Sequence, residues 1–384
     1  MSDKMSPQER AELTVAVIGA GIGGVSIAWF LHKAGFTVDL YDQAPAFLEV
    51  GGTIGIDNQS IDVLREWDAH QAVLDTAAPS VGMELRTMQG ELQHFLKIPD
   101  LTDMGVKVEG RTGMRETFGI QRSDLHGTIL SYFPVDRTHA NMRLTSVADK
   151  GTHAEAIFED GTVIRPRILI GADGIRSTVR KLFTDVEAPF ANVTICRSLA
   201  LASALPEGWA NDRGRRWEHP LPDGSSVNAI TGPTRRGTHV GIDTSIYMGD
   251  QLLDLPDNVV PLDRLLSLYP DDTDPALINL IKSNLVVTRS YPLYDLPEIH
   301  TWSSDCVTLL GDSAHAMRPL LGQGANQAIQ DAGELARQLV DNPDPSVALK
   351  AYEQIREPFT NAIKRAAKQF VPQYAKVFAA GKQD

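Results

Sequence analysis

The sequence has little cysteine and no excess of positive charge. Only Cys196 and Cys306 occur among its 384 residues, so neither a disulfide framework nor a cysteine-based zinc site is indicated. The 36 basic residues are outnumbered by 49 acidic ones, and the net charge of −13 argues against nucleic acid or an anionic membrane surface as a partner. The first twelve residues are polar and lack the apolar core of a secretion signal. We therefore expect a cytoplasmic protein.

A long uninterrupted apolar run is also missing. The most apolar window, 13–31, is broken by Gly19, Gly21, Gly23 and Gly24, which favours a strand, a glycine turn and a helix over a membrane span. We find no internal repeat and no low-complexity tract. With 42% hydrophobic and 22% charged residues, the composition is that of a globular chain with one large or two closely packed domains.

The first segment has the pattern of a nucleotide-binding βαβ unit. Residues 13–18 form an apolar run rich in β-branched side chains, which is typical of a parallel strand buried on both faces. Residues 25–33 read as a helix ended by Gly35, and residues 36–41 read as the second strand.

A glycine motif lies at the turn between that strand and helix. Gly19 would allow a tight turn, Gly21 a close approach to a pyrophosphate, and Gly24 close packing of the helix on the strand. The helix N-terminus would stabilise the charge of the diphosphate. Asp42, at the end of the second strand, is placed to accept hydrogen bonds from ribose hydroxyls. The unit alone does not choose between NAD and FAD, and the motif also occurs as a plain glycine-rich turn.

Two more strands of the same type run directly into distinctive motifs. Residues 168–172 lie inside the string 167–180, and residues 306–310 lead into the string 311–326. Because the three strands are far apart in the chain, they predict a discontinuous cofactor domain. Between them, alternating stretches such as 226–230 and 238–243, set off by turn signals, predict an antiparallel sheet that covers the cofactor.

Together the three motifs resemble the single-component (group A) FAD-dependent monooxygenases, the aromatic hydroxylase family that includes para-hydroxybenzoate hydroxylase. The resemblance covers roughly residues 12–340. It implies an α/β protein with a Rossmann-like FAD-binding domain, interleaved with a substrate domain on an antiparallel sheet and followed by a C-terminal helix. The expected boundaries are 10–85, 116–185 and 301–345 for the FAD domain, 86–115 and 186–300 for the substrate domain, and 346–384 for the helical segment.

The resemblance also assigns flavin contacts in the third motif. Asp312 would bond the ribityl chain, while Pro319, Gly322 and Gly324 would lie along the isoalloxazine ring. Ala325 would begin a helix over 325–339, whose N-terminal dipole would stabilise negative charge on the reduced flavin. An ordinary strand-to-helix turn is the alternative.

Further cofactor contacts are expected from other segments. By the same resemblance, Asp173 and Gly174 would touch FAD or its surroundings, and Arg122 would bond the ribityl–diphosphate region, for which five fixed donors are suited. Val147, just after a predicted strand, is expected near the adenine. The alternatives are a salt bridge of Arg122 with Asp124 or Glu116, and structural roles for Arg167 and for Arg180, which is expected to form an ion pair that holds its loop.

Catalytic side chains are less well indicated. His315 stands inside the flavin motif and is either catalytic or a packed, hydrogen-bonded histidine. Pro319, Tyr247 and Arg289 are further candidates. The substrate region has other polar residues whose spacing does not assign them a role: His219, His239, Tyr291 and Tyr294. Some relatives place a histidine base for a phenol near the position of Ser225, which speaks against such a histidine here.

The implied reaction uses FAD, NADH or NADPH, and O₂. Through a C4a-hydroperoxyflavin, one oxygen atom would hydroxylate or epoxidise an electron-rich aromatic or unsaturated small molecule. Alternatives are a flavin-dependent halogenase or reductase, or a noncatalytic flavin-binding sensor. The Trp-x-Trp-x-Ile-Pro signature of halogenases does not occur among the five tryptophans. We expect a monomer or homodimer without a metal site.

Overall fold

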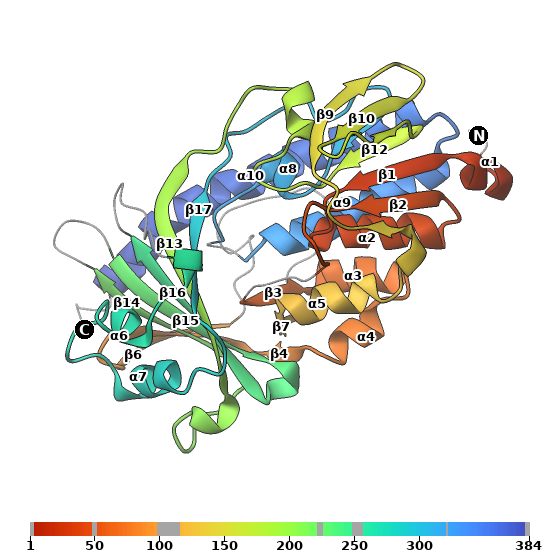
Figure 1. Cartoon of the computed structure of the whole chain (residues 1–384). Helices are drawn as coiled ribbons and strands as arrows, with labels where there is room; N and C mark the ends of the chain where they lie inside the picture. The colour runs from red at the N-terminus through yellow and green to blue at the C-terminus, as the bar shows by residue number, and fades with distance from the viewer. Residues whose placement is uncertain are drawn as a thin grey trace.

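Two large β-sheets lie at opposite ends of the molecule (Figure 1). The structure, a computed structural model, describes residues 4–47, 52–97, 116–220, 226–247, 256–319 and 322–380. One sheet is parallel and flanked by helices, and the other is almost wholly antiparallel. The α/β class predicted from the sequence, with a Rossmann-like domain beside an antiparallel sheet, is confirmed.

The parallel sheet has five strands in the order β18-β12-β1-β2-β8. Strands β18, β12 and β1 carry side chains that are nearly all buried, because the sheet is covered on both faces. The strands are β1 (Thr14–Ile18), β2 (Thr37–Tyr41), β8 (Thr138–His139), β12 (Ile168–Gly171) and β18 (Val307–Leu309). The three strands expected at 13–18, 168–172 and 306–310 are therefore neighbours, although they are far apart in the sequence.

Helices cover one face of this sheet and a small antiparallel sheet covers the other (Figure 1). On the second face Phe158 packs against Tyr41, with ring centroids 5.2 Å apart. The small sheet comprises β9 (Leu144–Asp149), β10 (Ala154–Phe158) and β11 (Val163–Ile164). The helices of this half are α1 (Pro7–Glu12), α2 (Ile22–Lys33), α3 (Asn58–Glu66), α4 (His70–Leu74), α5 (Arg122–Leu130), α8 (Asp312–His315) and α9 (Gly324–Asp341).

The second large sheet has seven strands in the order β17-β13-β16-β15-β14-β5-β6. Trp217 and Leu277 lie in the apolar core beneath it, where α6 (Leu262–Leu266) and α7 (Pro275–Lys282) pack. All neighbours are antiparallel except β14 and β5. The strands are β5 (Gly82–Thr87), β6 (Leu92–Lys97), β13 (Phe190–Leu201), β14 (Gly214–Pro220), β15 (Ser226–Thr234), β16 (His239–Tyr247) and β17 (Arg289–Tyr294). The sheet thus takes in residues from Gly82, four positions before the boundary expected at 86.

A three-stranded sheet joins the two halves. It consists of β3 (Thr53–Asp57), β7 (Thr117–Gln121) and β4 (Ala78–Ser80). Its contact with the large sheet needs glycine: a Cβ at Gly119 would lie 1.9 Å from the carbonyl oxygen of Pro233, and one at Gly241 would lie 1.8 Å from Oγ1 of Thr53. The three-stranded sheet and the seven-stranded sheet therefore pack so closely at these two positions that only glycine fits.

The C-terminal segment is one long helix, α10 (Pro345–Ala380), which runs along the back of the molecule (Figure 1). Its Tyr352 hydroxyl donates to the carbonyl of Leu309 at 3.1 Å, and Lys364 Nζ donates to the carbonyl of Leu296 at 2.6 Å. The helix is thus built into the cofactor half and does not form a separate unit. Within the described ranges, no helix is both long enough and apolar enough to cross a bilayer.

Candidate flavin and substrate site

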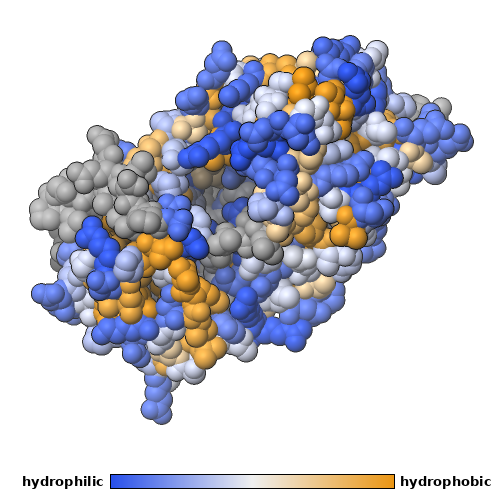
Figure 2. Space-filling model, in the orientation of Figure 1, coloured by the Kyte–Doolittle hydropathy of each residue, from blue (hydrophilic) through white to orange (hydrophobic). Residues whose placement is uncertain are grey.

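One cavity of about 510 Å³ connects the parallel sheet with the antiparallel sheet. Its wall takes residues from the glycine turn after β1, from the segment after β18, and from the face of the seven-stranded sheet. Figure 2 shows this side of the molecule hollowed between its two halves, with hydrophilic residues around the hollow. We distinguish a cofactor end, at the parallel sheet, from a sheet end, at the seven-stranded sheet.

The three glycines of the first motif have different surroundings. Gly19 has a φ of +100°, and a Cβ there would lie 2.3 Å from the carbonyl oxygen of Ala172. A Cβ at Gly24 would lie 1.8 Å from the carbonyl oxygen of Gly19. Gly21, by contrast, lines the cavity, and a Cβ there would meet no atom of the described chain within 4 Å. The first two glycines serve the fold, whereas Gly21 leaves room for a ligand.

The N-terminus of α2 opens into this room. Gly21 is the N-cap residue and supplies no side-chain hydrogen bond, and Ile22 and Gly23 of the first turn also line the cavity. Backbone N–H groups at such an end attract anions, because they are unsatisfied and because the helix dipole is positive there. The helix starts at Ile22, three residues earlier than the sequence predicts.

Asp42 follows β2 as expected, but its carboxylate bonds the protein. Oδ2 accepts from the backbone N–H of Ala20 at 2.7 Å, and Oδ1 accepts from that of Ala44 at 2.8 Å. Asp42 therefore fixes the glycine turn, and each oxygen retains lone-pair capacity for a ribose hydroxyl. Val147 lies inside β9, not after a strand, and packs against the core without lining the cavity.

The Asp-Gly motif of the second string is largely held within its own loop. Asp173 accepts from Ser177 Oγ at 2.5 Å and from the backbone N–H groups of Thr178 and Val179. Burial raises the pKa of this carboxyl group, although those donors oppose the rise. Gly174 lines the cavity, while the Asp173 side chain points into the loop.

Arg180 holds the same loop, but not through the expected ion pair. Its guanidinium donates to the carbonyls of Ser313 at 3.0 Å and Ile175 at 2.6 Å. Arg122 lines the cavity at the start of α5. Asp124, its expected alternative partner, forms a salt bridge with Arg235 at 2.8 Å.

The third motif forms the opposite wall of the cofactor end. Asp312 is exposed and lines the cavity, and no polar partner contacts its carboxylate in the part of the chain that the structure describes. Pro319, Gly322, Gly324 and Ala325 also line the cavity. The side chain of Gln323, the N-cap residue of α9, does not cap the backbone N–H groups of the helix, so a second helix N-terminus opens into the same space.

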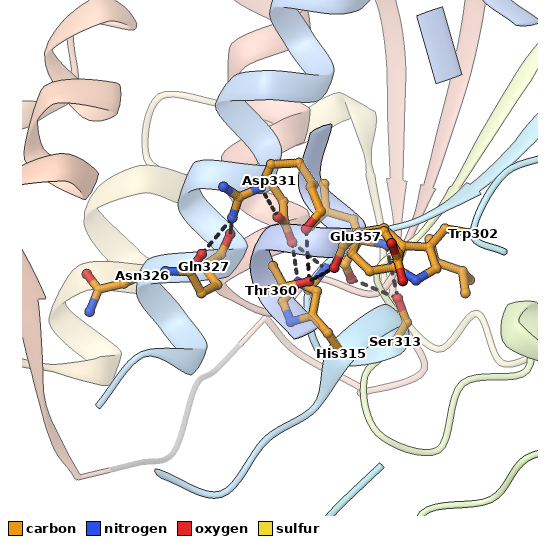
Figure 3. Close-up of polar contacts among 12 residues, drawn as sticks. Trp302, Ser313, His315, Asn326, Gln327, Asp331, Glu357 and Thr360 are labelled. Carbon is orange, nitrogen blue, oxygen red and sulfur yellow. Dashed lines mark hydrogen bonds and ion pairs between the residues drawn. The ribbon is translucent and has the colours of Figure 1, made fainter. Parts of the chain in front are cut away.

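His315 does not reach the cavity. It is fully buried, and its Nε2 donates to Oδ2 of Asp331 at 2.5 Å (Figure 3). Oδ1 of Asp331 accepts from Nε of Arg356 at 2.7 Å, and Arg356 also donates to Oε1 of Gln327. The catalytic interpretation of His315 is therefore replaced by its alternative: the turn of α8 directs the imidazole into a network that joins α8, α9 and α10.

The sheet end has charged residues that the sequence pattern did not predict for the site. Arg216, Ile230, Asp243 and Arg197 form one row across β14, β15, β16 and β13, and all four line the cavity. A signal is nevertheless present in the sequence: Arg197 is the only acidic or basic residue of β13, and Asp243 is the only acidic residue of β16. Their shared face, however, depends on strand register, which the sequence did not reveal.

Beside this row, three glycines lie on neighbouring strands. Gly232 is opposite Gly241, and Gly214 is opposite Met83. All four residues line the cavity. A Cβ at Gly232 would meet nothing within 4 Å among the described atoms. At Gly232 the floor of the cavity is therefore free of described side chains, whereas the Thr53 side chain covers Gly241 and the Met83 side chain approaches Gly214.

The polar residues predicted for the substrate pocket lie elsewhere. Arg289 is on the edge strand β17, and its Nη1 donates to the carbonyl of Asp257 at 2.6 Å. It does not line the cavity, and neither do His219, His239, Tyr291 and Tyr294. Tyr291 nevertheless packs under Arg197, with the guanidinium carbon 5.1 Å from the ring centroid. The Tyr247 side chain and Ser225 lie outside the described residues.

The donor set of the cofactor end fits FAD. This end of the cavity is lined by the uncapped N-termini of α2 and α9, by Arg122 and by the exposed Asp312. At Gly21, Gly174 and Gly322 a Cβ would meet no described atom within 4 Å. N–H groups and a guanidinium suit a diphosphate, and a carboxylate suits the hydroxyls of a ribityl chain. Fold and site together define a nucleotide-binding flavoprotein.

Comparisons with known proteins give the family. The model of the FAD binding domain matches residues 12–194 and 298–367, so the chain belongs to this family. It is 28% identical over 365 residues to 3-amino-4-hydroxybenzoate 2-monooxygenase PtnB3 of Streptomyces platensis, with 92% of this chain and 87% of the relative covered. It is 26% identical over 366 residues to 6-hydroxynicotinate 3-monooxygenase of Bordetella bronchiseptica, with 92% and 90% covered.

A solved structure shows the same fold. Klebsiella pneumoniae HpxO, crystallised with FAD and uric acid, superposes with a TM-score of 0.80 at 22% identity, over 97% of this chain and 94% of that one. The predicted resemblance to the flavin-dependent aromatic hydroxylases, the FAD cofactor and the enzyme class of FAD-dependent monooxygenase are confirmed.

Proposed function

We propose that this enzyme hydroxylates an electron-rich aromatic small molecule with one oxygen atom of O₂, using NADH or NADPH as the reductant. The observation that carries the proposal is that one cavity joins a cofactor end whose donors fit FAD to a sheet end with polar groups. The named relatives act on aminohydroxybenzoate and hydroxynicotinate, which supports an aromatic ring as substrate. The reaction route and the cytoplasmic location expected from the sequence are part of the same proposal.

The groups at the cofactor end would bind different parts of FAD. The first turn of α2 and Arg122 would bind the diphosphate, Asp312 the ribityl hydroxyls, and the N-terminus of α9 the pyrimidine edge of the ring. Bound FAD would supply the redox chemistry, taking hydride from the nicotinamide and activating O₂. The protein would orient the substrate on the sheet and exclude water from the cavity.

Turnover under ¹⁸O₂ tests this function. The holoenzyme is given NADH or NADPH with hydroxybenzoates and hydroxynicotinates, and product masses are measured. We expect a product heavier by one ¹⁸O atom. A halogenated product, a merely dehydrogenated product, or a hydroxyl oxygen taken from water would contradict the proposal. A flavin that NAD(P)H does not bleach would favour the noncatalytic sensor.

A further inference from the structure

The hairpin of β15 and β16 ends in an unusual turn, which we call the hairpin tip (Arg235–Gly237). Thr234 pairs with His239, so the loop between the strands has four residues. Most loops of this length are built on a type I turn, in which φ is negative. Here Arg235, Arg236 and Gly237 have φ values of +49°, +56° and +77°. The left-handed region is unfavourable for a residue with a Cβ, so such a turn persists only where surrounding contacts fix it.

Arg235 binds a helix of the cofactor half with two hydrogen bonds. Its Nε and Nη2 donate to the two carboxylate oxygens of Asp124 on α5, at 2.8 and 3.1 Å. A planar guanidinium that binds both oxygens fixes the orientation of its partner as well as the distance. The pair therefore joins the sheet end of the cavity to α5 in one defined geometry.

Arg236 anchors the same tip to a different part of the cofactor half. Its Nε donates to the backbone carbonyl of Asp75 at 2.5 Å, just after α4, and its backbone N–H donates to the carbonyl of Ala77 at 3.2 Å. Neither Asp75 nor Ala77 lines the cavity. The two arginines of the tip thus differ in one respect: the partner of Arg235 belongs to a helix that reaches the cavity, and the partners of Arg236 do not.

Helix α5 connects the hairpin tip with the glycine turn. Arg122 and Asp124 both lie in its first turn, and Arg122 lines the cavity. His126, one turn further along, is buried, and its Nε2 lies 2.7 Å from the carbonyl oxygen of Ala20 in the glycine turn. The helix is thus fixed to the glycine turn at His126 and to the hairpin tip at Asp124. The second attachment sets the orientation of the turn that carries Arg122.

Resting on the placement of the FAD diphosphate proposed above, we propose that Arg235 is a positioning residue for the cofactor. Through Asp124 it holds the first turn of α5 where the Arg122 guanidinium reaches the diphosphate. The same hairpin lines the sheet end of the cavity with Ile230 and Gly232, so one element supports the substrate and aligns a group that binds FAD.

The exposure of the pair separates this role from a purely structural one. Arg235 keeps 39% of its side-chain surface exposed and Asp124 keeps 22%. Ion pairs that are this accessible to water contribute little to the free energy of unfolding. Loss of the pair should therefore affect the affinity for FAD more than it affects folding.

The test is an equilibrium titration of the full-length apoprotein with FAD, without NAD(P)H or substrate, together with a thermal melt of each apoprotein. The variants are Arg235→Ala and Asp124→Asn, each made alone and together with Arg122→Gln. Arg236→Ala is the matched control, because it removes the same type of side chain from the next position of the tip. Arg235→Lys keeps the positive charge but not the paired donors, and replaces Arg235→Ala if that variant does not fold.

We expect Arg235→Ala and Asp124→Asn each to weaken FAD binding roughly 3- to 30-fold, with melting temperatures close to that of the wild type. The control should bind FAD as the wild type does. In the Arg122→Gln background the two mutations should add little, because the guanidinium that the pair positions is already gone. A role in stability alone would not produce this dependence on Arg122.

Wild-type affinity in either variant overturns the proposal, and so does equal weakening in the control. An undiminished effect in the Arg122→Gln background, or wild-type affinity of Arg122→Gln itself, overturns it as well. Should a variant also melt earlier, the comparison in the Arg122→Gln background still decides. Because the titration involves no turnover, this proposal and the proposed hydroxylation fail separately.

Discussion

At the residue scale, the site depends on a few glycine and aspartate residues that differ in whether they face the cavity or contact other parts of the protein. Gly19 and Gly24 are required by backbone contacts within the fold, whereas Gly21 borders only the cavity. Asp42 is bonded to the glycine turn, whereas Asp312 has no described polar partner. Some of the predicted cofactor residues thus build the turn and others face the cavity, and mutations can separate the two roles.

Gly21→Ala should weaken FAD binding without damaging the fold. Its φ is −69°, and the added methyl group would meet only the space assigned to the diphosphate. The matched control is Gly127→Ala, an exposed position of α5 with nothing within 4 Å, where alanine should stabilise the helix by about 0.5–1 kcal/mol. Titration of the apoproteins with FAD and thermal melts measure both effects. Wild-type FAD affinity in Gly21→Ala would refute the placement of the diphosphate.

Asp312→Ala should weaken FAD binding roughly 10- to 150-fold. A hydrogen bond to a charged group contributes about 1.5–3 kcal/mol, and the exposed carboxylate has no described protein partner whose loss would disturb the fold. Fluorescence titration with FAD gives the affinity, and the melting temperature of the apoprotein should stay unchanged. Unaltered affinity would show that the ribityl chain binds elsewhere.

Many of the residues that line the cofactor end of the cavity could be predicted from the sequence, but the charged residues of the sheet end could not. Glycine turns after buried strands act through local backbone geometry, so their spacing is visible in the sequence. Arg197 and Asp243 are opposite each other only because β13 and β16 pair in one register. His315 was ambiguous for a similar reason, since its partner Asp331 comes from the following helix.

At the scale of elements, the flavin motif is supported from behind by a buried ionic network. Asp331 of α9 accepts a hydrogen bond from His315 of α8 (Figure 3). It also accepts from Arg356 of α10 and from the backbone N–H of Gly311. Burial opposes ionisation of Asp331, but His315 and Arg356 outweigh it and lower its pKa. The helical tail, in which the sequence showed no catalytic group, therefore supports the cofactor site.

Asp331→Asn should destabilise the protein by about 3–5 kcal/mol at neutral pH, because Arg356 is left buried without its counter-charge. The folded pKa is below the unfolded value of about 3.9, so the stabilisation is present above that pH and is lost as the pH falls through the folded value. Urea unfolding at several pH values should show the gap between wild type and variant shrinking in acid. The exposed pair of Asp341 with Lys4 provides the control, and Asp341→Asn should change little. A gap independent of pH would argue against the network.

At the scale of the whole molecule, the cofactor cavity joins two halves that have separate hydrophobic cores. The class of both sheets could be predicted from alternation and from buried apolar runs. Their meeting through β3 and β7 could not, because it depends on long-range contacts such as that of Gly241 with Thr53.

FAD should therefore raise the melting temperature of the apoprotein more than FMN does at the same concentration. Only the dinucleotide has an adenosine half to engage the turn held by Asp42, and a ligand stabilises by RT ln(1 + [L]/Kd), about 2.7 kcal/mol at a hundredfold excess over Kd. Differential scanning fluorimetry of the apoprotein with each flavin measures the difference. Equal shifts would mean that the adenosine half makes no net contribution.

The glycine row, Gly214, Gly232 and Gly241, also bears on how the substrate range of this enzyme can evolve. At Gly232 the depth of the cavity is set by the size of one side chain, because a methyl group there would touch no described atom within 4 Å. Folding places no evident constraint on that position, while every added carbon removes volume from the place where a ring would lie. Substitution of Gly232 by progressively larger side chains should thus narrow the size range of the substrates, while the backbone stays unchanged. Directed evolution aimed at substrate size should find its first useful variants at this position.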